Sequence, residues 1–293
     1  MTNAASASDT RILFEGFGMG ESPRWRDGRL WFCSWGSNEI IAVGLDGTSE
    51  VIGPGGGGAG WAMGWLPDGR LLVTGAELMR VEADGSRVRH ADLGHVSPYG
   101  WSELTVDGRG NVYVDSLNFD FARFNELLGS GEAPGKIALI TPDGEAREVA
   151  DGLAFPNGMV VTEDNGTLIV AESFSRKLTA FDIAADGSLT NRRTWAEVTG
   201  DGICLDAEGA VWTTEVAPGD SGLCRRVGEG GEVLEQIELD RPPYACMLGG
   251  EDGRTLFMVA QRWFGPERMG ELIQAKTGRI VTARVGVPHA GWP

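Results

Sequence analysis

Short stretches of alternating apolar and polar residues, each preceded by an Asp/Gly turn, recur six times along the chain. The six stretches are DGRLWFCSW from Asp27, DGRLLVTG from Asp68, GNVYVDS from Gly110, GTLIVAES from Gly166, GAVWTTEV from Gly209 and DGRTLFMVA from Asp252. Their turn glycines are spaced 41, 41, 56, 43 and 44 residues apart. A period of about 40–50 residues, with strands rich in β-branched and aromatic residues, is typical of β-propeller blades.

A second set of turns lies between the first ones. It comprises Asp46-Gly47, Asp84-Gly85, Asp143-Gly144 and Asp186-Gly187, with looser counterparts near Gly230 and Gly278. Two hairpins in each repeat make four antiparallel strands, which is the content of one propeller blade. We therefore expect an all-β fold, a six-bladed β-propeller with four antiparallel strands per blade. Residues 11–293 are expected to form this single domain, and residues 1–10 a disordered N-terminal tail.

Two irregularities of the repeat lead to further expectations. The long step of 56 residues predicts an insertion in the third repeat, and the segment LNFDFARFNELLGSGEAP, residues 117–134, fits it. Insertions in propellers often lie on the binding face, although a neutral surface loop explains this segment equally well. Residues 12–17 and the C-terminal RIVTARVGV are expected to pair in one blade, because an open propeller would leave unpaired edge strands.

Composition agrees with a turn-rich β protein and narrows its partners. Glycine supplies 45 of the 293 residues, about twice the usual share. The formal net charge of −17 argues against a nucleic acid or an anionic membrane face as partner. No apolar run reaches the roughly 20 residues of a membrane-spanning helix, and MTNAASASDT lacks the features of a secretory signal. We expect a cytoplasmic protein with a small-molecule substrate, as a monomer or small homo-oligomer.

The cysteines give no sign of a metal or disulfide framework. Cys33, Cys204, Cys224 and Cys246 are scattered, without a C-x-x-C pair or a histidine at zinc spacing. They are expected to be buried thiols.

Candidate metal ligands occur at equivalent points of the repeats. The first strand of each blade should precede the first turn, and the residues seven to nine places before the turn glycines are Glu21, Trp61, Ser102, Asn157, Asp201 and Ala245. Equivalent positions of a ring converge on its axis, so two carboxylates and an amide oxygen are expected at a central channel. Oxygen donors without His or Cys suit Ca²⁺, Mg²⁺ or Mn²⁺. The alternative is a wet channel lined by polar residues that hold no ion.

Three segments of the chain resemble the senescence marker protein/gluconolactonase family, which includes regucalcin and sugar lactone lactonases. They are GESPRW around Glu21, GLAFPNGMVVTEDNGTLIVAESFSRKLTAFDI around Asn157 and GDGICLDAEGAVW around Asp201. The resemblance covers nearly the whole chain in the right order. It implies a six-bladed propeller with one divalent ion held by these three residues. Ca²⁺ is the first candidate, with Zn²⁺, Mn²⁺, Mg²⁺ and Fe²⁺ as alternatives.

The third repeat departs from the pattern of the family. Members commonly carry an Asn-Asp pair there, whose Asn contacts substrate or metal-bound water, and sugar lactonases add a nearby Arg. This chain has Ser102 in place of the Asn, Glu103 in place of the Asp, and no Arg. The departure favours a substrate other than a sugar lactone.

Aromatic residues near the expected channel also favour a substrate other than a sugar lactone. The predicted substrate-binding residues are Ser102, Trp61, Trp101, Tyr99 and Phe119. Filling of space between blades is the alternative role for each tryptophan. If several of these rings line the pocket, the substrate is more apolar or aromatic than gluconolactone.

The resemblance implies a metal-dependent hydrolase of the lactonase or esterase type. The ion would polarise the carbonyl group, and an activated water would attack it. A carboxylate is needed as general base. Asp201 is the first candidate, by resemblance, and Glu103 is the second, from its place beside the axis. A carboxylate that binds a dication is a weak base, which counts against Asp201. Strand alternation could instead turn Glu103 into the blade.

Two other functions remain open from the sequence. One is a metal-dependent isomerase, cyclase or lyase of a biosynthetic pathway, built on the same propeller. The other is a metal-stabilised binding scaffold. Serine hydrolysis and nucleotide hydrolysis have no support, because neither a G-x-S-x-G elbow nor a phosphate-binding loop is present.

Overall fold

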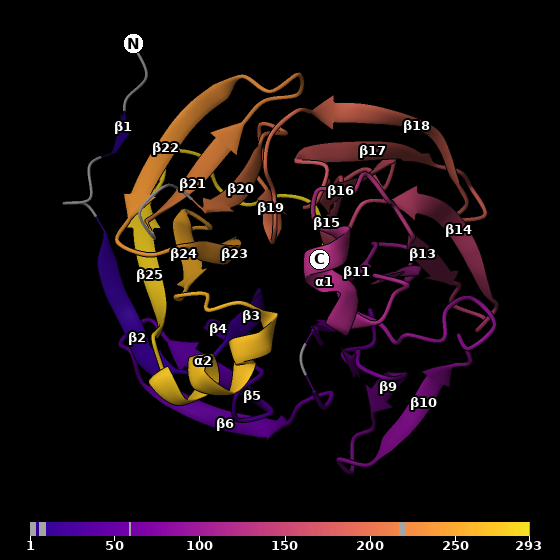
Figure 1. The fold of residues 1–293 in the computed structure, drawn as a ribbon, viewed down its shortest axis with the longest axis horizontal. Coiled ribbons are helices and arrows are strands. Elements are labelled where there is room, and N and C mark those ends of the chain that lie inside the picture. Colours follow the sequence, from indigo (N-terminus) through magenta and orange to yellow (C-terminus); the bar gives the residue numbers. More distant parts are fainter. Residues whose placement is uncertain (1–3, 6–9, 59, 217–220, 293) are drawn as a thin grey trace. The chain divides into compact units, whose positions relative to one another are not determined.

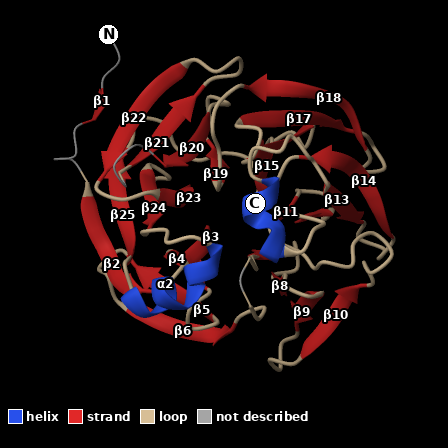
Figure 2. Cartoon of the chain, in the orientation of Figure 1, coloured by secondary structure: helices blue, strands red, loops and turns tan. Residues whose placement is uncertain are grey.

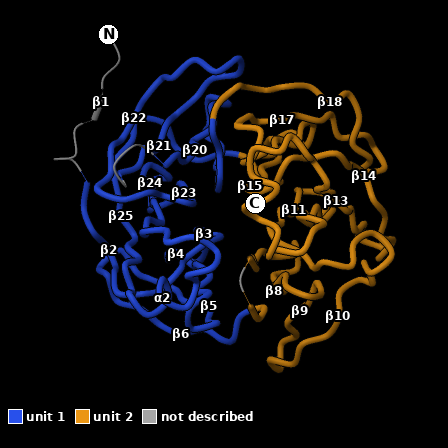
Figure 3. The backbone as a smooth tube through the Cα atoms, in the orientation of Figure 1, with its two compact units in different colours: residues 1–55, 199–290 blue, residues 56–198, 291–293 orange. Residues whose placement is uncertain are grey.

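The computed structural model describes residues 4–5, 10–58, 60–216 and 221–292. The chain divides into two compact units, unit 1 with Met1–Gly55 and Thr199–Ala290, and unit 2 with Gly56–Val198 and Gly291–Pro293 (Figure 3). Each unit contains three sheets, and each sheet has four antiparallel blade strands. Strands make up most of the regular structure in both units (Figure 2).

Unit 1 holds blades 1, 5 and 6 in chain order (Figure 1). Blade 1 consists of β3 (Gly20–Arg26), β4 (Arg29–Ser34), β5 (Glu39–Gly44) and β6 (Ser49–Pro54). Blade 5 consists of β19 (Ile203–Leu205), β20 (Val211–Val216), β21 (Gly222–Val227) and β22 (Val233–Leu239). Blade 6 consists of β23 (Pro243–Gly249), β24 (Thr255–Ala260), β25 (Gly278–Arg284) and β2 (Arg11–Phe17).

Unit 2 holds blades 2, 3 and 4 (Figure 1). Blade 2 consists of β7 (Met63–Trp65), β8 (Leu71–Val73), β9 (Leu78–Val81) and β10 (Arg87–Ala91). Blade 3 consists of β11 (Leu104–Val106), β12 (Val112–Ser116), β13 (Gly135–Ile140) and β14 (Ala146–Leu153). Blade 4 consists of β15 (Pro156–Val161), β16 (Thr167–Glu172), β17 (Lys177–Ile183) and β18 (Leu189–Ala196).

The hairpin turns between the first and second strands explain the spacing of the glycines. Gly28 and Gly209 have φ angles of 73° and 78°, a left-handed backbone that glycine adopts without steric cost. In the fourth repeat Asn165, with φ 58°, takes this conformation instead of Gly166, as asparagine tolerates it best among residues with a side chain. The six repeats of four antiparallel strands confirm the expected fold class, a six-bladed β-propeller.

Blade 6 is assembled from both ends of the chain. Strand β2 pairs antiparallel with β25, from Arg11 opposite Thr282 to Phe17 opposite Gly278. This confirms the expected pairing of residues 12–17 with RIVTARVGV. The prediction of a hairpin turn near Gly278 is wrong. This glycine begins β25, and the fourth strand of the blade comes from the N-terminal segment.

Two blades carry helical insertions between their second and third strands. In unit 2, the expected insertion of residues 117–134 contains the 3-10 helix η2 (Phe121–Arg123) and α1 (Phe124–Leu127). In unit 1, an insertion that we did not expect contains the 3-10 helix η3 (Pro266–Arg268) and α2 (Met269–Ala275). The second and third strands of an antiparallel blade connect at the end where its first strand begins. Each insertion therefore lies at that end of its own blade.

The core is formed by side chains that interlock between neighbouring blades. In unit 2, Leu104 and Val114 of blade 3 pack with Leu72 of blade 2, whereas Tyr113 of blade 3 packs with Met159 of blade 4. Successive side chains point to opposite faces of a strand, so blade 3 buries both of its faces. Unit 1 has the same arrangement.

Three smaller expectations concern the cysteines, the tail and the membrane. All four cysteines are buried free thiols, as expected. Residues 1–3 and 6–9 of the expected tail lie outside the described residues, and β1 (Ala4–Ala5) pairs in parallel with β22. In the described part of the chain, no helix has the length and apolar character needed to cross a membrane.

Candidate functional site

Glu21 is the second residue of β3, the first strand of blade 1, and it is 5% exposed. A β-bulge follows it, because Glu21 pairs with Cys33 while the next pair joins Arg24 and Trp31. Ser22, the residue in this bulge, has a φ angle of 51°. Such strained positions cost about 1–3 kcal/mol and are concentrated at functional sites. Bulges also redirect side chains beside such sites.

The backbone in front of Glu21 is fixed by Gln261, which follows β24 and is fully buried. The Gly20 N–H donates to Gln261 Oε1 at 3.3 Å, and Gln261 Nε2 donates to the Gly20 carbonyl at 3.1 Å. A side chain at position 20 would come within 2.5 Å of the Phe17 ring and 2.9 Å of Val259. Only glycine fits there, so blade 6 determines where β3 begins.

Asp201 is half-buried and lies just before β19, the first strand of blade 5. The next residue, Gly202, donates its N–H to the Tyr244 carbonyl of β23 at 2.7 Å. A Cβ atom on Gly202 would lie 2.6 Å from the Cα of Ala245, so glycine permits the close approach of the two strands. Within unit 1, β23 packs against both β19 and β3. Asp201 and Glu21 thus stand at the starts of the two first strands that flank β23.

Asn157 is the second residue of β15, the first strand of blade 4, and it is half-buried. A register shift between Pro156 and Met159 gives β15 a bulge like that of β3. Phe155, just before this bulge, has a φ angle of 60° and stacks on Phe174 with ring centroids 4.4 Å apart. A bulky residue in this conformation is an outlier. The sequence pattern predicted neither bulge.

The loop in front of Asn157 is held by the buried carboxylate of Glu172. This carboxylate accepts the Ala154 N–H at 2.8 Å and the Thr179 hydroxyl, and it pairs with Arg192 at 3.1 Å. Burial works to raise the pKa of Glu172, but these hydrogen bonds and cations outweigh it, so that the pKa is lowered. Among the described residues, none forms a hydrogen bond with the Asn157 side-chain amide. Its oxygen is available to a ligand.

Ser102 joins the first strands of blades 2 and 3. Its hydroxyl donates to the Gly60 carbonyl at 3.1 Å, and its carbonyl accepts the Thr74 hydroxyl at 2.5 Å. The Thr74 hydroxyl also accepts the Ala62 N–H at 2.7 Å. Ser102 thus has a packing role in unit 2, and its contact with substrate stays a prediction.

Glu103, just before β11, is paired with an aspartate that the sequence analysis missed. The Glu103 N–H donates to Asp115 Oδ1 at 3.1 Å, and the Asp115 N–H donates to the Glu103 carbonyl at 3.0 Å. Burial, and then the negative charge of Glu103, raise the pKa of Asp115 well above its usual value. In the sequence, Asp115 is one residue of the strand GNVYVDS, and only the strand register shows its neighbour.

The predicted aromatic residues differ in exposure. Trp61 is 0% exposed, Trp101 and Phe119 are each 5% exposed, and Tyr99 is 56% exposed. The Phe119 ring lies 6.1 Å from that of Phe155, so the insertion of unit 2 covers the loop in front of Asn157. The buried rings shape the surroundings of the first strands, and their contact with substrate stays a prediction.

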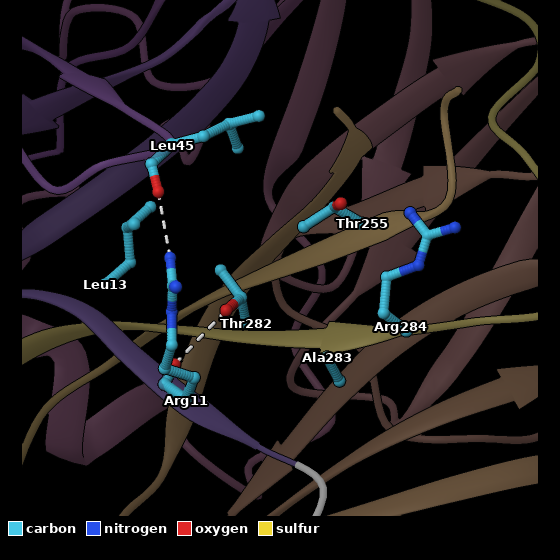
Figure 4. A pocket seen from close by; sticks show the side chains of 7 residues that line it. All are labelled: Arg11, Leu13, Leu45, Thr255, Thr282, Ala283 and Arg284. Atoms are coloured by element: carbon cyan, nitrogen blue, oxygen red, sulfur yellow. Dashed lines mark hydrogen bonds between the residues drawn. The ribbon is translucent and has the colours of Figure 1, made fainter. Parts of the chain in front are cut away.

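A pocket of about 410 Å³ lies elsewhere in unit 1 (Figure 4). Its lining includes Arg11, Leu45, Thr282 and Arg284. Arg11 donates to the Leu45 carbonyl at 2.8 Å and accepts the Thr282 hydroxyl with its own carbonyl at 3.3 Å. These residues belong to β2, β25 and a turn of blade 1, and none of the predicted site residues lines the pocket.

The candidate ligands fit a hard divalent ion. Glu21 and Asp201 supply carboxylates and Asn157 supplies an amide oxygen, a donor set that Ca²⁺ and similar ions prefer. Each of the three residues stands at the start of a first strand, and two of them sit at bulges. Among the described residues, no group of three or more His, Cys, Asp or Glu side chains is placed to hold a metal ion.

Six blades of four antiparallel strands define a β-propeller, and the predicted ligands Glu21, Asn157 and Asp201 stand at the starts of the first strands of three of these blades. The SMP-30/Gluconolactonase/LRE-like family model matches residues 19–262. The chain therefore belongs to this family.

Known relatives are distant in sequence and close in fold. The chain is 26% identical to diisopropyl-fluorophosphatase of Loligo vulgaris over 42% of this chain and 38% of that protein. It is 28% identical to regucalcin of Bos taurus over 50% of each chain. It thus spans half or less of the length of these two relatives. A solved regucalcin from Agrobacterium tumefaciens, described as a calcium-binding protein, matches with a TM-score of 0.76 and 18% identity, covering 97% of this chain and 96% of that one.

Proposed function

We propose that this protein is a divalent-metal-dependent hydrolase of the lactonase type, which opens a lactone or a related ester with water. The observation that carries the proposal is the set of oxygen donors at equivalent strand starts, Glu21, Asn157 and Asp201, in a chain that belongs to a gluconolactonase-like family. The names of the family and of the fluorophosphatase point to hydrolysis. The calcium-binding regucalcin supports Ca²⁺ as the first candidate ion.

The three ligands would bring two negative charges and one neutral oxygen to the ion. A divalent ion held there supplies Lewis-acid polarisation of the substrate carbonyl and makes a nearby water more acidic. The two carboxylates need no additional protein cation, because their charge balances that of the ion.

For the general base we place Glu103 ahead of Asp201, which reverses the order that the sequence favours. Side chains alternate along a strand, so Glu103 shares a face with Thr105, whose partner Tyr113 packs against blade 4. Glu103 is thus turned toward the blade that carries Asn157. In the reaction, its carboxylate would take a proton from the attacking water and return one to the departing alkoxide oxygen. As a residue outside the ligand set, it avoids the weak basicity of Asp201.

We expect gluconolactone to be a poor substrate, opened with a kcat/KM at least about 10-fold below that of an aromatic or alkyl lactone. The reasons are the replacement of the family asparagine by Ser102, the absence of the arginine of sugar lactonases, and the aromatic residues nearby. Steady-state kinetics on a series of lactones, esters and phosphotriesters, with and without Ca²⁺, would measure this.

Two results of that series would contradict the proposal in different ways. Equal kcat/KM values for gluconolactone and the best aromatic lactone would remove the substrate preference. Complete inactivity on every hydrolysable substrate, combined with tight metal binding, would favour a non-hydrolytic enzyme on the same propeller.

Metal is expected to stabilise the protein. A ligand that binds only the folded state adds about 2.7 kcal/mol when present at 100 times its Kd, so Ca²⁺ should raise the melting temperature and EDTA should lower it. Glu21→Gln should reduce the Ca²⁺-dependent rise, whereas Glu251→Gln, at an exposed carboxylate of unit 1, should leave it unchanged. Identical melting curves with Ca²⁺ and EDTA, and no metal in elemental analysis, would exclude the metal site.

A further inference from the structure

Glu103 and Asp115 form a cross-strand pair in unit 2. Leu104 pairs with Val114 in the last regular position of the ladder. One residue further, the Asp115 N–H donates to the Glu103 carbonyl, whereas the Glu103 N–H donates to the Asp115 side chain and the Ser102 N–H donates to the Asp115 carbonyl. Cross-strand partners of an antiparallel pair lie on the same face of the sheet. Both carboxyl groups therefore lie on the face of blade 3 that is turned to blade 4.

Asp115 is the more deeply buried member of the pair. It is 0% exposed, whereas Glu103 is 8% exposed. Asp115 Oδ1 accepts one backbone N–H, and Asp115 Oδ2 is buried without a hydrogen-bond partner. A buried carboxylate with an unsatisfied oxygen is costly, and protonation removes this cost. The neutral acid would also place an O–H donor on that oxygen.

Within the described residues of unit 2, no cation offsets a negative charge on Asp115. Among the described residues packed around β12, Lys136 of β13 instead pairs with Glu148 at 2.9 Å and donates to the Val96 carbonyl. The Tyr113 hydroxyl of β12 itself donates to a distant carbonyl. Strand β15 has no titratable side chain. Glu103 is the charged group whose effect on Asp115 is resolved, and its charge disfavours ionisation.

We propose that Glu103 and Asp115 together hold one proton at neutral pH and act as a single acid–base couple, with Glu103 as the member that exchanges protons with the substrate. Asp115 is then a positioning residue, which holds the backbone of Glu103 through two hydrogen bonds. This inference rests on the proposed hydrolytic function.

The proton balance of the couple is simple. Before the reaction, the pair carries one proton and one negative charge. When water attacks the ester carbonyl, Glu103 takes one proton from it, and both carboxyl groups become neutral. When the ring C–O bond breaks, Glu103 gives a proton to the alkoxide oxygen, and the pair returns to its initial state. No other reactant is needed.

Infrared spectroscopy tests the proton of the pair without any substrate. We expect a carboxylic-acid carbonyl band from one protonated group at pH 7 in the wild-type protein, and its loss in Asp115→Asn. In Glu103→Gln, the like charge is removed, so the Asp115 band should disappear at a lower pH than in the wild-type protein. Absence of an acid band in the wild type, its persistence in Asp115→Asn, or an unchanged titration in Glu103→Gln would each overturn the proposal. If Asp115→Asn does not fold, the wild-type and Glu103→Gln titrations decide.

Kinetics test the use of that proton. Asp115→Asn should lower kcat by about 10–100-fold with little change in KM, and it should shift one limb of the pH–rate profile. Thr105→Val is the matched control, because Thr105 Oγ1 lies on the same face, fully buried and without a hydrogen-bond partner. It should leave the pH–rate profile unchanged. An unshifted profile in folded Asp115→Asn would overturn the role in catalysis.

The two experiments separate this inference from the proposed function. If the wild-type protein opens no lactone or ester, the proposed function fails, and infrared spectroscopy still decides whether the pair holds one proton. If hydrolysis is observed and the acid band is missing, only the acid–base couple fails.

Discussion

Asp201→Asn is expected to lower lactone opening by at least about 1000-fold while the protein stays folded. The substitution keeps the size of the side chain and removes its charge, so the proposed ion loses one of its two carboxylates. Lewis-acid catalysis by a bound ion is worth several kcal/mol, and about 4 kcal/mol corresponds to a factor of 1000 in rate. The measurement is kcat/KM at saturating Ca²⁺, with circular dichroism and the metal content determined on the same preparation.

The metal content distinguishes the two roles of Asp201. Loss of both metal and activity would identify a ligand, whereas loss of activity with the metal retained would identify the general base. Asp151→Asn, at an exposed carboxylate, is the matched control and should behave as the wild type. A variant Asp201→Asn that keeps a tenth or more of the wild-type kcat/KM would remove Asp201 from both roles.

Asp206→Ala is expected to be the most destabilising single substitution of a carboxylate in blade 5. Asp206 is 1% exposed, and its carboxylate accepts Arg226 Nε at 2.6 Å and the N–H groups of Glu208 and Ala210 at 2.9 and 3.1 Å. Arg226 is itself 7% exposed. Removal of one partner from a buried ion pair costs about 3–5 kcal/mol, and we expect the lower end of this range because Arg226 keeps Glu208 at 2.7 Å and Glu235 at 3.6 Å as partners. The free energy of unfolding from urea denaturation measures the loss.

Asp107 provides the matched control for this prediction. It occupies the same turn in blade 3, where its carboxylate accepts the N–H groups of Arg109 and Asn111 and the Asn111 amide. Asp107→Ala therefore loses turn hydrogen bonds without removing a partner of a buried cation, at a cost of about 1–3 kcal/mol. Equal losses in the two variants would show that the Arg226 pair contributes nothing specific.

The repeat itself was predictable, because each hairpin requires particular turn residues. Gly28 and Gly209 occupy left-handed positions that exclude most side chains. Glycine therefore recurs along the sequence with the period of the blades. The error at Gly278 has the opposite cause. The helix α2 has only seven residues, which is too few to show a helical period. Without that period, the glycine after the helix resembles the glycine of a hairpin turn.

The positions of the candidate ligands were predictable, but their local geometry was not. Counting back from the turn glycines placed Glu21 and Asn157 at the starts of first strands, where the structure has them. The bulges beside them depend on a single extra residue, which does not disturb the apolar pattern. The left-handed Ser22 and Phe155 carry no sequence signal, because neither residue type favours that conformation.

The role of Asp115 could not be predicted from the pattern of its own strand. An aspartate at the end of an apolar strand is ordinary in a sequence. Its proposed role depends on Glu103, 12 residues earlier, and on the pairing of β11 with β12, which brings the two residues together. Contacts of this kind depend on pairing between strands, which a hydrophobic pattern does not specify to the single residue.

The composite blade 6 determines the order in which the protein can be completed during synthesis. Strand β2 is translated before blades 1 to 5, but its partner β25 is translated only after them. Unit 2, apart from its last residues, is one continuous stretch, Gly56–Val198, and all of its strands are available well before that. The N-terminal strand must therefore wait without its antiparallel partner until β25 has been translated.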